Sequence, residues 1–374
     1  MTINKAMQPR SNGGVLGWFA AGLGRILVSI FVPIVTFIVL WQGFLFLRDS
    51  HAPQLVLVLV AILWGVGGVA LLYLVSNWVV EQLPGGWTQR LQPFVFVGPA
   101  LAILGWFLAI PTVRTLYLSF MDANSFHFVG ISNYIYAFTD RIMLEAFRNN
   151  LLWMIFGTSL SVGFGLLIAV LSDRSRYESV YKAIIFMPMA ISFVGAGVIW
   201  KFIYSFKGTG SGIQEIGLLN AIVLGMGGAA QPWLQTPPWN NFLLIVIMVW
   251  LQTGYAMVIL SSAIKGVPSE LLEAARIDGA SEVQGFFGIT IPYIQGTLIT
   301  VATTILIFSL KIFDIVSVMT GGNYGTNVIA YEFYITRFTF GDAGRASAIA
   351  VVLLVAVIPV MIYNLRQFRE SKAF

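Results

Sequence analysis

Residues Glu273 to Pro292 read EAARIDGASEVQGFFGITIP, a mostly polar stretch between two long apolar runs. Glu273, Ala274 and Ala275 favour a helix, whereas Gly279 interrupts it at a cost of about 1 kcal/mol relative to alanine. Pro292 marks the start of the next apolar run. The segment is therefore predicted to form two short helices joined at Gly279.

The two predicted helices expose apolar side chains and have no core of their own. These side chains form two surfaces, with Leu271, Leu272 and Ala275 on one and Phe286, Phe287 and Ile289 on the other. Such unpaired apolar faces beside polar residues predict that another protein binds to this segment.

The spacing of the segment resembles a signature of the membrane subunits of binding-protein-dependent ABC importers. Glu-Ala-Ala is followed after three residues by Gly279, after nine more by Ile289, and then by Ile291 and Pro292. Asp278, Gly279 and Ala280 give the Asp-Gly-Ala form that is typical of sugar importers. An ordinary amphipathic cytoplasmic loop is the alternative, and it does not explain so many matched positions.

In that family the segment forms a coupling helix that docks in a cleft of the ATP-hydrolysing subunit. The resemblance therefore implies that a partner ATPase is contacted by Glu273, Ala274, Ala275, Asp278, Gly279, Ala280, Phe286, Phe287 and Pro292.

Composition agrees with a membrane protein. The 374 residues are 58% hydrophobic and 10% charged, whereas soluble domains carry about 25% charged residues. A bilayer crossing needs about 20 apolar residues and must be helical. The sequence thus predicts an all-α, polytopic membrane protein with about eight spans, near 25–47, 55–80, 93–120, 150–172, 180–205, 241–264, 291–318 and 347–365.

The basic residues indicate the orientation of the spans. With a cytoplasmic N-terminus, twelve Lys and Arg residues fall on the cytoplasmic side and six on the other side. Both termini and the 273–292 segment are then cytoplasmic, and the first span is expected to remain as an anchor. The net charge of +5 reflects this bias and needs no nucleic-acid partner. The resemblance implies a bacterial inner membrane.

Candidate catalytic and metal-binding residues are scarce. The chain has no cysteine, and its two histidines, His51 and His127, lack spaced partner ligands. The glycine-rich stretch Lys207 to Gly212 is followed by Ile213 and Gln214 and lacks the Lys-Ser/Thr pair of a phosphate-binding loop. We therefore expect no enzymatic activity, no metal site and no cofactor in this chain. If ATP drives this chain, as the resemblance implies, ATP and Mg²⁺ bind to partner subunits.

The chain is predicted to divide near residue 92. Residues 1–92 hold a cytoplasmic N-terminus and two accessory spans, and residues 93–374 form the transporter unit with a coupling loop at about 265–292. This organisation resembles the MalF-type (maltose/α-glucoside) permeases, and it implies the type I ABC importer fold. Residues 121–149 are too short for the large external domain of the maltose system, so none is predicted.

Polar and aromatic side chains recur at similar depths in spans five to seven; they are Ser192, Phe193, Gln252, Thr253, Tyr255 and Ser309, and Met189 lies at the same depth. Such groups suit a polar solute such as a sugar. Interhelical packing, worth about 0.6 kcal/mol per hydrogen bond, is an almost equally good explanation for any one of them. Lys311 and Asp314 are predicted to form a structural ion pair on one helical face.

Alignment with the maltose-type subunits implies substrate contacts at Met189, Phe193, Leu251, Gln252, Tyr255, Ile305, Phe308, Ser309 and Ile312. Only Tyr255 and Phe308 retain the same residue type, so the location is implied but the identity of the sugar is not. An α-glucoside, a glucoside-type compatible solute, a maltodextrin and another di- or monosaccharide all remain open.

The resemblance also implies the partners: a second, distinct (MalG-like) permease, two ATP-binding subunits and an extracytoplasmic solute-binding protein. The external loop 208–240, with Trp233 and Trp239, anchors to the membrane interface or contributes to docking of the binding protein. Two other classes remain as alternatives: an ion-coupled secondary transporter, which needs no ATP, and a membrane receptor or scaffold, which moves no solute.

Overall fold

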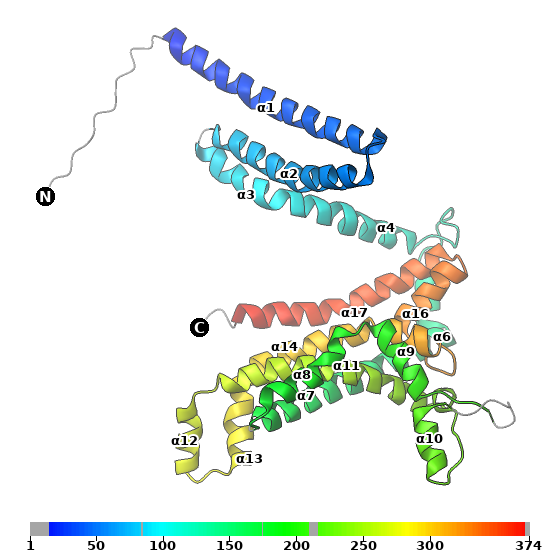
Figure 1. The fold of residues 1–374 in the computed structure, drawn as a ribbon. Coiled ribbons are helices and arrows are strands. Elements are labelled where there is room, and N and C mark those ends of the chain that lie inside the picture. The colour runs from blue at the N-terminus through cyan, green and yellow to red at the C-terminus, as the bar shows by residue number, and fades with distance from the viewer. Residues whose placement is uncertain (1–14, 84, 174, 209–215, 371–374) are drawn as a thin grey trace. The chain divides into compact units, whose positions relative to one another are not determined.

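The computed structural model describes residues 15–83, 85–173, 175–208 and 216–370 (Figure 1). Within these ranges the regular secondary structure is helical, apart from one isolated antiparallel bridge between Met121 and Phe128. The all-α prediction is therefore confirmed. The chain divides into two compact units, Met1–Thr112 and Val113–Phe374, which are described separately.

The first unit is a series of long apolar helices. It comprises α1 (Val15–Asp49), α2 (Gln54–Glu81), α3 (Gly85–Leu104) and the π-helical turn η1 (Gly105–Ala109), and α4 (Ile110–Leu118) then leads into the second unit. Trp64 Nε1 donates a hydrogen bond to the carbonyl of Leu40 at 2.9 Å and fixes α2 against α1. Most other side chains of residues 31–49 of α1 and of α2 are exposed, as expected for helices surrounded by lipid.

The second unit contains the remaining helices. They are α5 (Ser132–Thr139), α6 (Arg141–Leu152), η2 (Trp153–Gly157), α7 (Thr158–Asp173), α8 (Glu178–Phe186), η3 (Met187–Ala190), α9 (Phe193–Ile203), α10 (Leu218–Gly225), η4 (Trp233–Gln235), α11 (Trp239–Lys265), α12 (Ser269–Ile277), α13 (Glu282–Gly285), η5 (Phe286–Thr290), α14 (Ile291–Leu310), α15 (Asp314–Met319), α16 (Ile329–Tyr334), η6 (Ile335–Thr339) and α17 (Ala343–Glu370).

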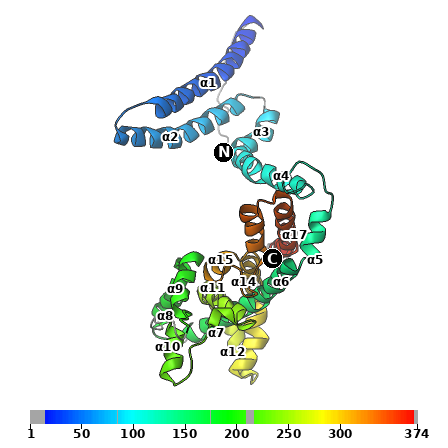
Figure 2. The same cartoon turned by 90° about the vertical axis from the view of Figure 1, so that its right-hand side faces the viewer.

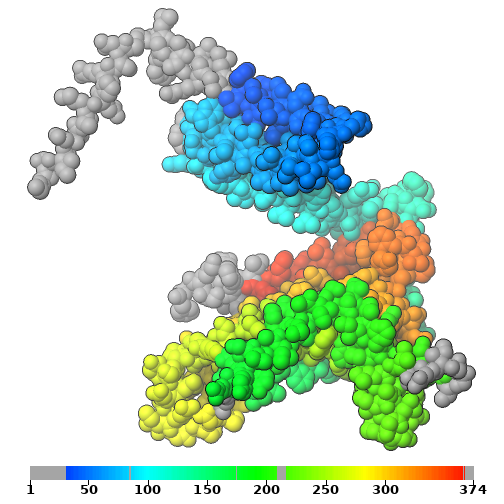
Figure 3. Space-filling model, in the orientation of Figure 1, coloured from blue at the N-terminus to red at the C-terminus, as the bar shows by residue number. Residues whose placement is uncertain are grey.

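Helix α11 is the centre of this unit. Two thirds of its most apolar window are buried, because α7, α8 and α14 pack around it, as the end-on view in Figure 2 shows. Its side chains Leu244, Met248 and Leu260 are fully buried in the main core. In Figure 1, α12 and α10 lie crosswise at opposite ends of these spans, and Figure 3 shows both projecting from the body.

The predicted spans agree with the structure in number. Seven described helices are long and apolar enough to cross a membrane, and a bent pair supplies an eighth. Two predicted spans need correction. The run 180–205 is not one helix, because it bends by 101° between Ala190 and Phe193. The run 291–318 ends as a helix at Leu310, and this helix continues back through a π-helical turn to Glu282.

Candidate functional site

A cavity of about 330 Å³ lies where the bent helix pair meets two other spans. Its walls come from η3, α9, α11, α14 and the residue at the break, and they are formed by Met189, Ile191, Phe193, Leu251, Gln252, Tyr255, Thr304 and Phe308. The structure thus brings together six of the nine residues aligned with substrate contacts. Substrate binding by these residues stays a prediction.

The break in the bent helix pair follows from its local sequence. Pro188 lies in the 3₁₀ turn η3 and cannot donate a backbone hydrogen bond. Ile191 is then extended, and the Ser192 hydroxyl caps α9 by accepting a hydrogen bond from the Gly195 amide at 3.0 Å. The chain therefore turns sharply and presents Met189 and Phe193 to the cavity. Non-helical backbone at membrane depth is tolerated where it lines a cavity.

Gly254 sets the distance between α8 and α11. A Cβ atom at this position would lie 2.5 Å from the Ile185 carbonyl oxygen and 2.7 Å from Phe186 Cα. Only glycine allows so close an approach of the two backbones. Gln252, which is buried, and Tyr255, which is half-buried, flank this crossing point.

Three of the aligned residues lie outside the cavity lining. Ile305 and Ser309 are fully buried in helix packing, and the Ser309 hydroxyl bonds to the Ile305 carbonyl at 2.9 Å. Ile312 is also buried and follows the end of α14. Thr304 lines the cavity instead, and the sequence signal for it is its position one turn before Phe308.

The predicted Lys311–Asp314 ion pair is wrong because α14 ends at Leu310, before both residues. Lys311 is the residue after α14, and Asp314 begins α15, so the two residues do not share a helical face. Among the described residues no ion pair joins them.

The coupling loop (265–292) forms the predicted turn at Gly279. Helix α12 ends at Ile277, and Gly279 adopts a positive φ of 84°. The Ala280 amide donates to the Ala275 carbonyl at 2.9 Å and the Gly279 amide to the Arg276 carbonyl at 3.1 Å, which is the Schellman pattern. The second helix, however, is not short, because α13 runs on into α14.

Two side-chain contacts brace the turn. Arg276 forms an ion pair with Glu282 at 2.9 Å, and Ser281 and Gln284 form a reciprocal capping box at the start of α13. The π-helical turn η5 ends at Thr290, two residues before Pro292, which lies in the first turn of α14. A wider turn accommodates a proline ring inside a continuous helix, so Pro292 does not start a new element here.

The predicted coupling residues divide by exposure. Glu273, Ala274, Asp278, Gly279, Phe287 and Pro292 are exposed, and Ala275, Ala280 and Phe286 are half-buried. Phe287 is 65% exposed, and its ring meets Phe286 edge-on. Ile277 and Val283 are exposed too and were missed by the sequence argument. The outer surface of the loop therefore combines exposed apolar side chains, Ile277, Val283 and Phe287, with acidic residues that include Glu273 and Asp278.

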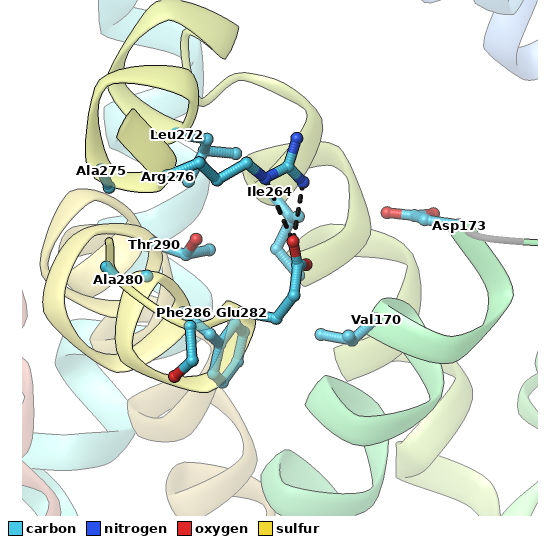
Figure 4. Close-up of a pocket in the computed structure, with 12 residues that line it drawn as sticks. Val170, Asp173, Ile264, Leu272, Ala275, Arg276, Ala280, Glu282, Phe286 and Thr290 are labelled. Atoms are coloured by element: carbon cyan, nitrogen blue, oxygen red, sulfur yellow. Dashed lines mark hydrogen bonds and ion pairs between the residues drawn. The ribbon is translucent and has the colours of Figure 1, made fainter. Parts of the chain in front are cut away.

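A second cavity, of about 210 Å³, lies behind the coupling loop (Figure 4). Ala275, Ala280 and Phe286 face it, together with the Arg276–Glu282 ion pair. In Figure 4, Asp173 at the end of α7 lies across this cavity from that ion pair. The half-buried coupling residues thus face the body of the unit, and the exposed ones face outward.

Metal binding finds no support in the described part of the chain. There is no group of three or more His, Asp or Glu residues that could hold a metal ion among the described residues. His51 and His127 are both exposed. Residues 209–215, which hold most of the glycine-rich stretch, lie outside the described residues.

Comparison with known proteins identifies the family. Residues 161–370 match the family described as the inner membrane component of binding-protein-dependent transport systems. The chain belongs to this family. It is therefore a multi-pass inner membrane protein, the permease of a binding-protein-dependent ABC importer, and it is not itself the catalytic component. The resemblance read from the coupling loop is confirmed.

Two relatives of this ABC importer permease are especially similar. The osmoprotective compounds uptake permease protein GgtC of Synechocystis sp. is 56% identical over 278 residues, which are 74% of this chain and 99% of that protein. The alpha-glucoside transport system permease protein AglF of Rhizobium meliloti is 49% identical over 285 residues, 76% of this chain and 84% of that protein.

A solved structure supports the fold of the permease. The bacterial alginate ABC transporter, in complex with its alginate pentasaccharide-bound periplasmic protein, contains a chain that superposes with a TM-score of 0.65. That match covers 75% of this chain and 96% of the other at 18% identity. At this identity the likeness shows the fold alone, and it confirms the expected ABC importer permease architecture.

Proposed function

We propose that this permease imports a neutral glucoside that an extracytoplasmic solute-binding protein delivers. A second, distinct permease completes the membrane pathway, and two ATP-binding subunits bind ATP and Mg²⁺ on the cytoplasmic side. The observation that carries the proposal is the cavity at the helix break, whose eight lining residues include amide, hydroxyl and aromatic groups but no charged side chain.

The chemistry of the cavity suits a sugar ring. The Gln252 amide and the Thr304 hydroxyl can exchange hydrogen bonds with sugar hydroxyls. Phe193, Tyr255 and Phe308 offer aromatic faces for the apolar side of a pyranose. A cavity without charge disfavours an acidic or strongly cationic solute, because desolvating an unpaired charge is costly.

The names of the two relatives support the same solute class. One is a permease for alpha-glucosides and the other a permease for osmoprotective compounds. A glucoside that serves as a compatible solute belongs to both classes. A betaine is the rival osmoprotectant, since aromatic rings also bind quaternary ammonium groups.

The coupling loop supplies the drive in this proposal. It lies on the cytoplasmic side together with both termini, and it docks in a cleft of an ATP-binding subunit. Exposed Glu273 pairs with a basic residue there, and Phe287 fills an apolar pocket. Closure of the ATP-binding subunits then moves the loop and exposes the cavity alternately to the two sides.

The test is reconstitution of the intact complex. The tagged chain is purified with its associated subunits and placed in liposomes with ATP inside and the binding protein outside. Uptake of labelled α-glucosides, a glucoside-type compatible solute and glycine betaine is then measured. We expect ATP-dependent glucoside uptake and little betaine uptake. Uptake of betaine alone, uptake without ATP, or an absence of solute flux would each refute the proposal.

A further inference from the structure

Five side chains meet where α7 ends, α8 begins and α11 ends. We call Asp173, Glu178, Lys182, Ser261 and Lys265 the charge clamp. Lys182 Nζ donates to Asp173 Oδ1 at 2.6 Å and also to Glu178 and Ser261. The Ser261 hydroxyl donates to the same Asp173 oxygen at 2.7 Å, and Lys265 donates to Glu178. Two lysines and two carboxylates thus balance in charge.

The inner part of the clamp, Asp173, Lys182 and Ser261, is sheltered, whereas Lys265 at its edge is 52% exposed. The side chains of Lys182 and Asp173 are 18% and 15% exposed, and Ser261 is buried. Sheltered pairs that are also hydrogen-bonded are less screened than exposed ones, and removing one partner leaves a charge without compensation. Because Lys182 points inward, it is poorly placed to contact another subunit.

The clamp is one end of a continuous seam between α8 and α11. On α11, Gly254, Ser261 and Lys265 are spaced by seven and four residues, so they lie on one face. Glu178 and Lys182 lie one turn apart on α8, and Ile185 on the same helix meets Gly254. The other side of α8 is largely exposed. The seam therefore holds α8 from its first turn up to the edge of the cavity.

Both ends of the seam lead to functional elements. Beyond Ile185 the chain enters η3 and the break, where Met189 and Phe193 line the cavity. Only residues 266–268 separate Lys265 from α12 of the coupling loop. Asp173 also lines the cavity behind that loop, and its Oδ2 atom is buried without a hydrogen-bond partner (Figure 4).

We propose that the charge clamp makes α8 and α11 move as one body, with Lys182 as the positioning residue. A displacement of the coupling loop then reaches the cavity wall at Met189 and Phe193 through α8 instead of being lost between the two helices. This inference rests on the proposed coupling function of the loop.

The experiment separates the clamp from that function by measuring distance as well as transport. The chain has no cysteine, so Ile184→Cys on α8 and Ile259→Cys on α11, both exposed, can carry nitroxide labels. In the assembled complex the distance between the labels is measured without nucleotide and after trapping with ATP and vanadate. This readout does not depend on which solute is carried.

Lys182→Met is the test variant, Lys182→Arg the conservative one, and Lys201→Met on an exposed position of α9 the matched control. We expect a narrow distance distribution in both states for the parent chain, the Arg variant and the control. Lys182→Met should broaden it and lower solute import per ATP hydrolysed by about tenfold, within the usual range of coupling energies.

Two results would overturn the inference. One is import per ATP at the parent level in Lys182→Met. The other is lost import with an unchanged distance distribution, which would place the action of Lys182 outside the α8–α11 seam. If Lys182→Met fails to assemble, Ser261→Ala removes two clamp hydrogen bonds without leaving an unpaired charge. A distance distribution and an import per ATP equal to those of the parent chain in Ser261→Ala would then also overturn the inference.

Discussion

Replacing Gly254 by alanine tests how the cavity is built. The added Cβ would lie 2.5 Å from the Ile185 carbonyl oxygen, and both of its nearest contacts are backbone atoms of α8. A backbone cannot rotate away as a side chain can. The α8 backbone must therefore retreat by about 0.9 Å for this contact to reach an ordinary 3.4 Å. The retreat moves η3, and with it Met189, away from Gln252 and Tyr255.

Two free-energy terms oppose each other in this variant. Overpacking costs about 1–3 kcal/mol, and replacing glycine inside a helix returns about 1 kcal/mol. The net loss of stability is then about 0–2 kcal/mol, small enough for the complex to assemble. If the solute loses about 1 kcal/mol of binding free energy, the KM for uptake rises about fivefold. Proteoliposome uptake and thermal unfolding in detergent measure the two effects.

Gly163→Ala is the matched control. Gly163 lies in α7, and a Cβ there would meet no atom within 4 Å. The control should be as stable as the parent or slightly more stable, with an unchanged KM. If Gly254→Ala shows the same KM and unfolding midpoint as Gly163→Ala, then the close approach of α8 to α11 does not shape the cavity.

Four further substitutions test the site and the loop. Glu273→Lys should leave insertion intact and lower solute import per ATP by about tenfold; normal import in proteoliposomes would remove Glu273 from the coupling contact. Tyr255→Ala should raise the KM for uptake about fivefold, because about 1 kcal/mol of contact between the ring and the solute is lost. The control is Tyr293→Ala, which should leave the KM unchanged because Tyr293 is exposed on α14 and does not line the cavity. Equal KM values in the two variants would make Tyr255 a packing residue. Gly279→Ala should strain the turn by about 1–2 kcal/mol, because a positive φ is unfavourable for alanine. Hydrogen exchange at the Ala280 amide should then be faster, and an unchanged exchange rate would contradict the strain. Ser192→Ala should cost about 1 kcal/mol through loss of the α9 cap, seen as a lower unfolding midpoint that Ser192→Asn restores; a midpoint equal to the parent would mean that the cap contributes little.

The sequence predicted the positions of the spans well, because segments in contact with lipid must be apolar. It predicted the directions of the helix axes less well, because hydropathy carries no information on where a helix bends. The run through Pro188 is apolar on both sides of the break, so hydropathy does not mark the 101° turn, although Pro188 and the Ser192 cap favour a break there. Likewise residues 312–319 are mostly apolar apart from Asp314 and Ser317, although α14 has ended at Leu310.

In the candidate site too, the sequence predicted the depth of residues along a helix better than the direction in which their side chains point. Alignment placed Ile305 and Ser309 at the right depth, but successive helical residues differ by about 100° in direction. Thr304 and Phe308 therefore face the cavity, whereas Ile305 and Ser309 face the helix packing. The coupling loop was easier to predict, because the requirement for a left-handed residue fixes the turn at Gly279 regardless of tertiary packing.

The break at Ile191 joins two helices, α8 and α9, that pack against different parts of the unit. On one side α8 is held to α11 by the seam that ends at Gly254. On the other side α9 packs on α15, where a Cβ at Gly197 would lie 2.9 Å from Val318. Packed bodies resist internal deformation, so relative movement between them concentrates at the extended residues that join them. Met189, Ile191 and Phe193 surround this joint and also line the cavity. The walls of the cavity thus belong to two bodies, and a rotation at the joint changes its shape without unpacking either one.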